Sequence, residues 1–376
     1  MSNKRRGEEK YENQDRRCRC RCRSGSDDNK KHKHLYVALD DWKKGFSIYK
    51  IDVDSFNNDK QEEGMNLDPP VLQLESPVGG IFYGAMSFSA LGTKMFTFMN
   101  QRCGLIYDTD TAVLAIGPHA PQHLVCGFAT FIPVGGMLYA LSRHAHERKY
   151  SFFVMSWGPT ASDESKPTEG WSWNSLPPPP AEFNSHVASY SLHRDGCTIF
   201  MTTNHESKMC TYSFDTKRSV WTWHGYWAWT WHGYWALPFL GQGFFDAELD
   251  AWVGLRFDGT VCSCHVVSPT ATPTNQEPDW KMTQEKLAED LTLSDKLVSA
   301  SLAHMGRNKF CLIQSLARDG EEGHALGDHN GCLLQLTMFR LKHNHNGQLQ
   351  ITSSKITRSF IVSRNRNHFR PAVFWM

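Results

Sequence analysis

The chain has 376 residues, of which 40% are hydrophobic and 12% aromatic, so it can bury a large core. No apolar run reaches the roughly 18 residues of a membrane-spanning helix, and the charged beginning lacks the apolar core of a signal peptide. We therefore expect neither a membrane span nor secretion, and we expect the 11 cysteines to be reduced thiols. The formal charge of +1 combines a basic arm with a mildly acidic remainder.

The basic arm, residues 1–33, has almost no apolar content, so it is predicted to be disordered. Residues 1–34 carry 12 Lys or Arg and 6 Asp or Glu, whereas the remainder carries 28 and 33. The run CRCRCR (18–23) suits a soft metal or nucleic acid, but it lacks the partners of a closed zinc site, and a low-complexity tail is the commoner explanation. The runs at 4–6 and 30–33 match either nuclear import signals or ordinary solvated charge.

From His34 onward one pattern recurs: an apolar strand, a Gly or polar turn, and a second apolar strand with an aromatic residue near its middle. Complete instances occupy 87–99, 130–142, 189–203, 243–257 and 299–314, and residues 34–40 match the second strand alone. The aromatic anchors are Tyr36, Phe96, Tyr139, Phe200, Trp252 and Phe310. A third strand follows each anchor, and a fourth often ends in a Pro-marked turn.

Units of about four strands that recur every 50 residues or so are typical of propeller blades, which must stack on their neighbours to bury both faces. Six anchors predict six blades. The first blade lacks its leading strand, and the apolar tail HFRPAVFW (368–375) is expected to supply it. Pro371 would restrict that strand to a sheet edge.

Four connections differ from the repeat. Polar, Pro- and Gly-containing insertions are predicted at 156–170 and 269–279, and a mobile loop at 316–331. The segment 281–297 has helix-forming residues with leucines at helical spacing, which predicts a short helix.

The phrases YSFDTKRSVWTW…LPF and YDTDTAVLAIGP resemble a kelch-type propeller. Kelch blades also carry a Gly-Gly pair at a strand end, and the pairs here, at 79–80 and 135–136, are placed differently. The phrases YDTDTAVLAIGP, WHGYWALPF and AELDAWVGL make residues 34–363 similar to a large family of uncharacterised kelch-like proteins in grasses. That resemblance implies a fold more than a function. Many plant kelch propellers follow a helical F-box, but residues 1–33 contain no amphipathic helix that would support one.

The sequence offers weak evidence for a metal or catalytic site. Cys262 and Cys264 share a strand face while His265 points away, and buried thiols are the commoner explanation. The histidine pairs 119/123 and 343/345 are expected in exposed loops and turns. The chain has no GxSxG, HExxH, P-loop or GxGxxG motif. We therefore predict no metal, no cofactor and no enzymatic activity.

The octamer WTWHGYWA occurs twice in succession, at 221–228 and 229–236. Sixteen extended residues would span roughly 53 Å, too long for one blade strand, so a break is expected at Gly225 and Gly233, as His-Gly hairpins. In one interpretation, one copy is the outer strand and the other a tolerated insertion. In the other, the aromatic side chains form an exposed platform that binds a partner. The residues of that platform are Trp227, Trp229, Trp231, Tyr234 and Trp235.

These observations predict an all-β, six-bladed kelch-like propeller over 34–376, preceded by the disordered basic arm 1–33. The expected function is a non-enzymatic scaffold for a protein or peptide partner, in the cytoplasm or nucleus. The alternative is an enzyme or small-ligand binder that uses the central channel. Nucleic-acid binding would rest on the arm alone, because the remainder carries no net basic charge.

Overall fold

The computed structural model of the chain divides into two compact bodies, Met1–Lys33 and His34–Met376. The predicted disorder of residues 1–33 concerns a segment that lies almost entirely outside the described residues. The described residues are 32–56, 64–75, 86–99, 102–124, 129–144, 149–160, 168–181, 183, 186–205, 208–218, 229–233, 235–268, 278–290, 294, 296–318, 327–365 and 370–376.

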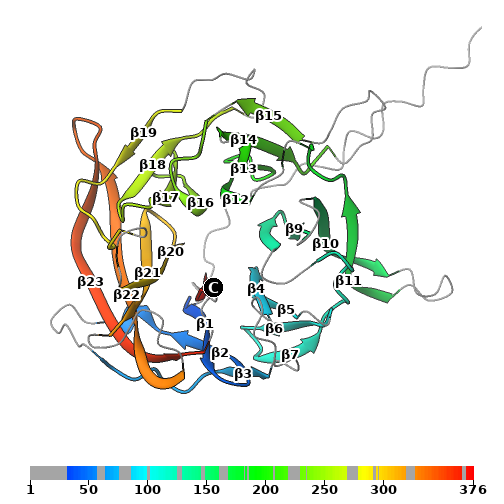
Figure 1. Ribbon diagram of the computed structural model, residues 1–376, viewed down its shortest axis with the longest axis horizontal. Coiled ribbons are helices and arrows are strands. Elements are labelled where there is room, and N and C mark those ends of the chain that lie inside the picture. The colour runs from blue at the N-terminus through cyan, green and yellow to red at the C-terminus, as the bar shows by residue number, and fades with distance from the viewer. Residues whose placement is uncertain are drawn as a thin grey trace, which may run out of the picture. The chain divides into compact units, whose positions relative to one another are not determined.

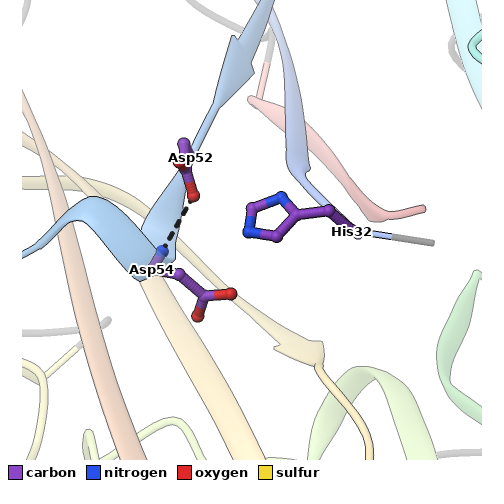
Figure 2. Close-up of side chains that lie close together, drawn as sticks. All are labelled: His32, Asp52 and Asp54. Carbon is purple, nitrogen blue, oxygen red and sulfur yellow. Dashed lines mark hydrogen bonds between the residues drawn. The ribbon is translucent and has the colours of Figure 1, made fainter. Parts of the chain in front are cut away.

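Residues 34–376 are all β apart from one 3₁₀ turn, Val53–Ser55, among the described residues. Asp52 precedes that turn, and its Oδ1 accepts the N–H of Asp54 at 3.0 Å (Figure 2). Figure 2 also draws His32, which belongs to the other body. The group of side chains in this figure therefore includes only two residues of 34–376, the exposed carboxylates of Asp52 and Asp54. No helix in the described part of the chain has the length and apolar content to cross a membrane.

The strands form six antiparallel four-stranded units, which follow one another in Figure 1. Unit 1 contains β24 (Ala372–Trp375), β1 (Leu35–Trp42), β2 (Gly45–Ile51) and β3 (Leu72–Glu75). Unit 2 contains β4 (Met86–Leu91), β5 (Lys94–Met99), β6 (Gly104–Asp108) and β7 (Val113–Ile116). Unit 3 contains β8 (Ala129–Val134), β9 (Met137–Arg143), β10 (Tyr150–Thr160) and β11 (Thr168–Leu176).

The other three units follow the same order from first to last strand. Unit 4 contains β12 (Val187–Leu192), β13 (Thr198–His205), β14 (Lys208–Asp215) and β15 (Trp229–Gly233). Unit 5 contains β16 (Leu240–Asp246), β17 (Ala251–Leu255), β18 (Val261–His265) and β19 (Trp280–Met282). Unit 6 contains β20 (Leu297–His304), β21 (Lys309–Ala317), β22 (Gly327–His343) and β23 (Leu349–Arg364). Units 4 and 5 merge into one eight-stranded sheet, because β12 pairs in parallel with β16.

The predicted anchors are confirmed as core residues. Each lies in the second strand of a different unit, and each is at most 3% exposed. The apolar runs that contain them have both faces buried, because alternate side chains point toward the preceding and the following unit. In β1, for example, Leu35 and Val37 pack against unit 6, whereas Tyr36 and Ala38 pack toward unit 2.

The core is divided into apolar clusters that each join two successive units. Units 1 and 2 share one cluster, and further clusters join 2 to 3, 3 to 4, 4 to 5 and 5 to 6. Another cluster joins unit 6 back to unit 1. The six units therefore pack as a closed circuit, in which every unit has a neighbour on each face.

The chain end completes unit 1, as predicted. β24 pairs antiparallel with β1, from Leu35 opposite Trp375 to Ala38 opposite Ala372. His34 and Met376 extend the ladder, with each N–H donating to the other residue's carbonyl (2.7 and 3.1 Å). Pro371 immediately precedes β24, and the strand is an edge of its sheet, so the missing N–H costs no ladder bond.

In their described parts, the predicted loops 156–170 and 316–331 are strand except at residue 318. β10 and β11 stay paired up to Thr160 opposite Thr168, leaving only 161–167 outside the described residues. Similarly, β22 begins at Gly327, and the rest of the predicted loop, 319–326, lies outside them. The insertion 269–279 falls mostly outside them too, at 269–277. The polar composition therefore predicts strands that are too short, because exposed outer strands accept polar side chains on both faces.

The prediction of a helix at 281–297 is wrong for the described residues of that segment. β19 runs to Met282, and no helix forms through 290. The N–H groups of Leu287 and Ala288 both donate to the carbonyl of Gly259. In a helix, these N–H groups would instead donate to carbonyls within the helix itself. Gly259 has φ +81°, and a Cβ there would lie 2.1 Å from the carbonyl oxygen of Ala288, so this contact requires glycine.

Candidate partner-binding surface

Within the described residues, the duplicated tryptophan segment supplies the strand β15 and the buried side chain of Trp235; its first copy, which includes Gly225, lies outside them. Its second copy begins β15, in which Trp229 pairs with Phe214 and Trp231 with Tyr212 of β14. The His-Gly hairpin expected at Gly233 is wrong, because Gly233 is still paired with β14, opposite Thr211. His232 is instead the extra residue of a bulge, which provides the break that the strand's length required.

Trp235 belongs to the core and is not available to a partner. It is 2% exposed and, with Leu237 and Phe239, fills the cluster between units 4 and 5. The Phe239 ring occupies the space that a Cβ of Gly243 or Gly254 would need, since such atoms would lie 2.3 Å from it. The alternation of Trp, Leu and Phe in WALPF therefore predicts burial better than it predicts a platform.

Of the other four predicted binding residues, Trp227 and Tyr234 lie outside the described residues. Trp229 and Trp231 are placed in β15 by their backbone alone. Their participation in partner binding stays a prediction.

Among the strands whose side chains are described, β7 (VLAI), the last strand of unit 2, is the one whose residues are all apolar and all exposed. All four of its residues are exposed, and Ile116 is 86% exposed. Three of the nine large apolar side chains that are exposed in the described residues are in this one strand: Val113, Leu114 and Ile116. Figure 1 shows β7 at the periphery, with β6 between it and the rest of its unit.

The backbone of β7 is also open on its outer side. In an antiparallel ladder, residues alternate between bonding the neighbouring strand and pointing away from it. Gly117 donates to the carbonyl of Gly104 at 2.7 Å, so Val113 and Ala115 also face β6. The N–H and C=O groups of Leu114 and Ile116 consequently point away from the sheet. Within the described residues no strand pairs with this edge.

Other outer strands carry the charges that discourage such pairing. Of the outer strands whose side chains are described, only β7 lacks a charged residue. The charged residues in the others include Glu75 in β3, Glu169 in β11, Lys281 in β19 and Lys355 in β23.

A second exposed apolar group lies at one end of unit 5. The Arg256 guanidinium lies over the rings of Trp280 (4.4 Å) and Phe257 (5.2 Å), and its Nε is 3.3 Å from Asp258 Oδ2. Phe257 and Met282 are about half exposed. Here an intramolecular cation already covers the aromatic faces, which leaves less apolar surface open than β7 does.

Polar side chains at the end of unit 3 form two separate pairs. Arg143 Nη1 lies 2.7 Å from His186 Nε2, and His144 Nε2 lies 2.8 Å from Ser151 Oγ. Burial, followed by the charge of Arg143, lowers the pKa of His186, which favours the neutral imidazole as acceptor. Arg143 lies opposite Tyr150 in the ladder, and Ser151 is the next residue after Tyr150. Because successive side chains of a strand point to opposite faces, the Arg143–His186 and His144–Ser151 contacts lie on opposite faces of the hairpin and do not converge.

The remaining histidine and cysteine expectations have mixed outcomes. Cys262 and Cys264 are fully buried and His265 is exposed, as predicted. Burial raises the pKa of Cys262 to about 12, so the thiol stays protonated and is a poor metal ligand. His343 is only half-buried and lies 3.2 Å from Ser263 Oγ of unit 5, which corrects its predicted full exposure. His345, His119 and His123 are exposed, as expected.

Residues 32–359 match a family described as a protein of unknown function, DUF1668. The chain belongs to the DUF1668 family. No curated protein matches this DUF1668 chain.

Solved structures that resemble the DUF1668 chain include TolB from Acinetobacter baumannii, at 11% identity and a TM-score of 0.47, covering 91% of this chain and 66% of that one. A complex of KlAtg21 with the coiled coil of AgAtg16 matches at 10% identity and a TM-score of 0.42, covering 86% and 82%. Kluyveromyces lactis Hsv2 matches at 10% identity and a TM-score of 0.40, covering 86% and 95%. At these scores the likenesses carry no argument about function.

Proposed function

We propose that residues 34–376 form a six-bladed, kelch-like β-propeller that serves as a non-enzymatic scaffold for a protein partner. The six four-stranded units, one anchor in each and the cluster between the last unit and the first support the blade count. The seven cysteines with described side chains are free thiols, in keeping with a location in the cytoplasm or nucleus.

The observation that carries this function is β7. Apolar side chains exposed on both faces of an uncharged edge strand are costly in a monomer, because they expose apolar area and invite unspecific pairing. A protein partner that covers β7 removes that cost. Burying the side chain of Val113, Leu114 or Ile116 stabilises the complex by at most about 1.5–3 kcal/mol each before the cost of association.

The test is affinity capture from an extract of cells that express the protein, followed by mass spectrometry. Wild type is compared with Ile116→Lys, which places a charge at the most exposed position of β7. Met282→Lys is the matched control, since Met282 is also exposed at the end of an outer strand, β19. We expect Ile116→Lys alone to lose the captured partner. Equal capture by all three proteins would refute the assignment to β7.

A further inference from the structure

We infer that β7 pairs antiparallel with β7 of a second copy of this chain, around a two-fold axis at Ala115. This inference rests on the proposed function, because it names the partner that covers the same strand. The pairing joins two four-stranded units into an eight-stranded sheet across the two molecules. Units 4 and 5 already form a sheet of that size within one chain, through a parallel contact.

The register follows from which backbone groups are open. Leu114 and Ile116 point their N–H and C=O groups outward, so hydrogen-bonded pairs must join these positions. In a register centred on Ala115, Leu114 lies opposite Ile116 of the second copy. The two-fold axis likewise places Ile116 opposite Leu114 of the second copy. All four outward groups on each strand are then satisfied.

The ends of β7 limit the pairing to this length. Ala112 has φ +56°, which interrupts the extended backbone before Val113. Pro118, at the other end, has no N–H to donate. A register centred on Leu114 would require Ala112 as a paired residue, so the centre at Ala115 fits better.

The charges at the two ends select the antiparallel direction. Exposed Asp110 precedes the strand, whereas exposed Arg102 lies beyond its other end, where its Nε donates to the carbonyl of Ala120 at 2.7 Å. Antiparallel pairing around Ala115 places the start of each β7, which Asp110 precedes, at the end of the other β7 beyond which Arg102 lies. Parallel pairing would instead bring the two Asp110 carboxylates together, which is unfavourable.

Side chains on both faces gain cover in this arrangement. Leu114 and Ile116 share a face with Tyr107 and Leu105, their partners on β6. Those two side chains pack against the cluster between units 1 and 2. Pairing continues this apolar row across the axis into the second copy. On the opposite face the two Ala115 side chains meet, and their small size lets the strands approach.

Sedimentation of the full chain at concentrations from micromolar to millimolar tests the association. We expect wild type to shift from monomer to dimer, and Ile116→Lys to remain monomeric. Leu114→Pro removes an outward N–H while keeping an apolar side chain and every bond to β6, so it should weaken the dimer at least about tenfold. Leu114→Val, which keeps the N–H and an apolar side chain similar in size to proline, is the matched control and should weaken it less. A monomeric wild type at millimolar concentration, or a dimer unaffected by Leu114→Pro, would overturn the inference.

The register is tested by cysteine substitution under mild oxidation. Ala115→Cys lies opposite its own copy at a non-hydrogen-bonded position and should form a covalent dimer. Ile116→Cys lies opposite Leu114 and should not exceed the wild-type background. Equal crosslinking of the two variants would contradict the two-fold register. If wild type is monomeric but Ile116→Lys still loses a captured partner, the inference fails while the proposed function stands.

Discussion

Two strands of this chain have the same length and similar composition but opposite surroundings. β24 (AVFW) and β7 (VLAI) each have four apolar residues, and each lies at the edge of a four-stranded sheet. Every residue of β24 is partly buried, whereas every residue of β7 is exposed. In Figure 1 the chain end lies near the centre and β7 at the periphery.

The difference comes from the strand's position in its unit. β24 is the first strand, and its alternate side chains reach two clusters: Val373 and Trp375 pack against unit 6, and Ala372 and Phe374 toward unit 2. β7 is the last strand, and none of its side chains belongs to a cluster among the described residues. Burial in this fold is therefore set by which strand is innermost, and hydrophobicity alone does not predict it.

Deleting residues 370–376 removes β24 and should have the largest effect. Four half-buried apolar side chains and the ladder to β1 are lost, and the inner edge of unit 1 is left open. We expect a loss of about 4–6 kcal/mol in the free energy of unfolding, measured with urea. Removal of residues 1–33 is the control and should leave stability unchanged. A truncated chain as stable as the full one would show that β24 does not close the circuit.

Trp252→Ala should cost about 3–5 kcal/mol, because it leaves a large cavity between units 4 and 5. Trp252 is fully buried, and its Nε1 donates to the carbonyl of Leu192 at 2.9 Å. Trp157→Ala is the matched control: that side chain is 55% exposed, so the loss should be within about 0.5 kcal/mol. Similar losses for the two variants would contradict the contrast between inner and outer positions.

Asp246→Asn should reduce stability by about 1–3 kcal/mol at neutral pH. The Asp246 carboxylate joins units 5 and 6, since Oδ2 accepts from Asn308 N at 2.8 Å and lies 2.9 Å from His304 Nε2. Burial opposes ionisation, but bonds from His304, Asn308 and Leu249 outweigh it and lower the pKa of Asp246.

Because that pKa is lower in the folded than in the unfolded chain, the stabilisation is complete above the unfolded value of about 4 and is lost as the pH falls through the folded value. Stability of wild type should therefore decline below about pH 4 more steeply than that of Asp246→Asn. Parallel stability–pH profiles of the two proteins would rule out the Asp246 carboxylate as the source of the steeper decline.

Deleting one octamer should have the smallest effect. Either deletion yields the same sequence, and the remaining copy can supply both β15 and the buried Trp235. We expect unfolding curves that coincide within about 0.5 kcal/mol. A loss of several kcal/mol would mean that both copies are integral to unit 4.

The sequence predicts the repeat well because each inner strand is buried on both faces, which leaves continuous apolar runs such as LYVAL around Tyr36. Closure by the tail was predictable for the same reason. The exposure of β7 was not, because an apolar run looks the same whether or not another unit covers it. The aromatic neighbours of Trp235 favour a surface platform, whereas its alternation with Leu237 and Phe239 indicates the core.

The open backbone edge of β7 can be measured by residue-resolved amide hydrogen exchange of the dilute, monomeric protein. We expect slow exchange at Ala115, which faces β6, and fast exchange at Leu114 and Ile116, with protection of the latter two appearing as concentration rises. Equally slow exchange at all three positions in the monomer would contradict an open edge, since the outer edge of β7 would then already be paired within the chain.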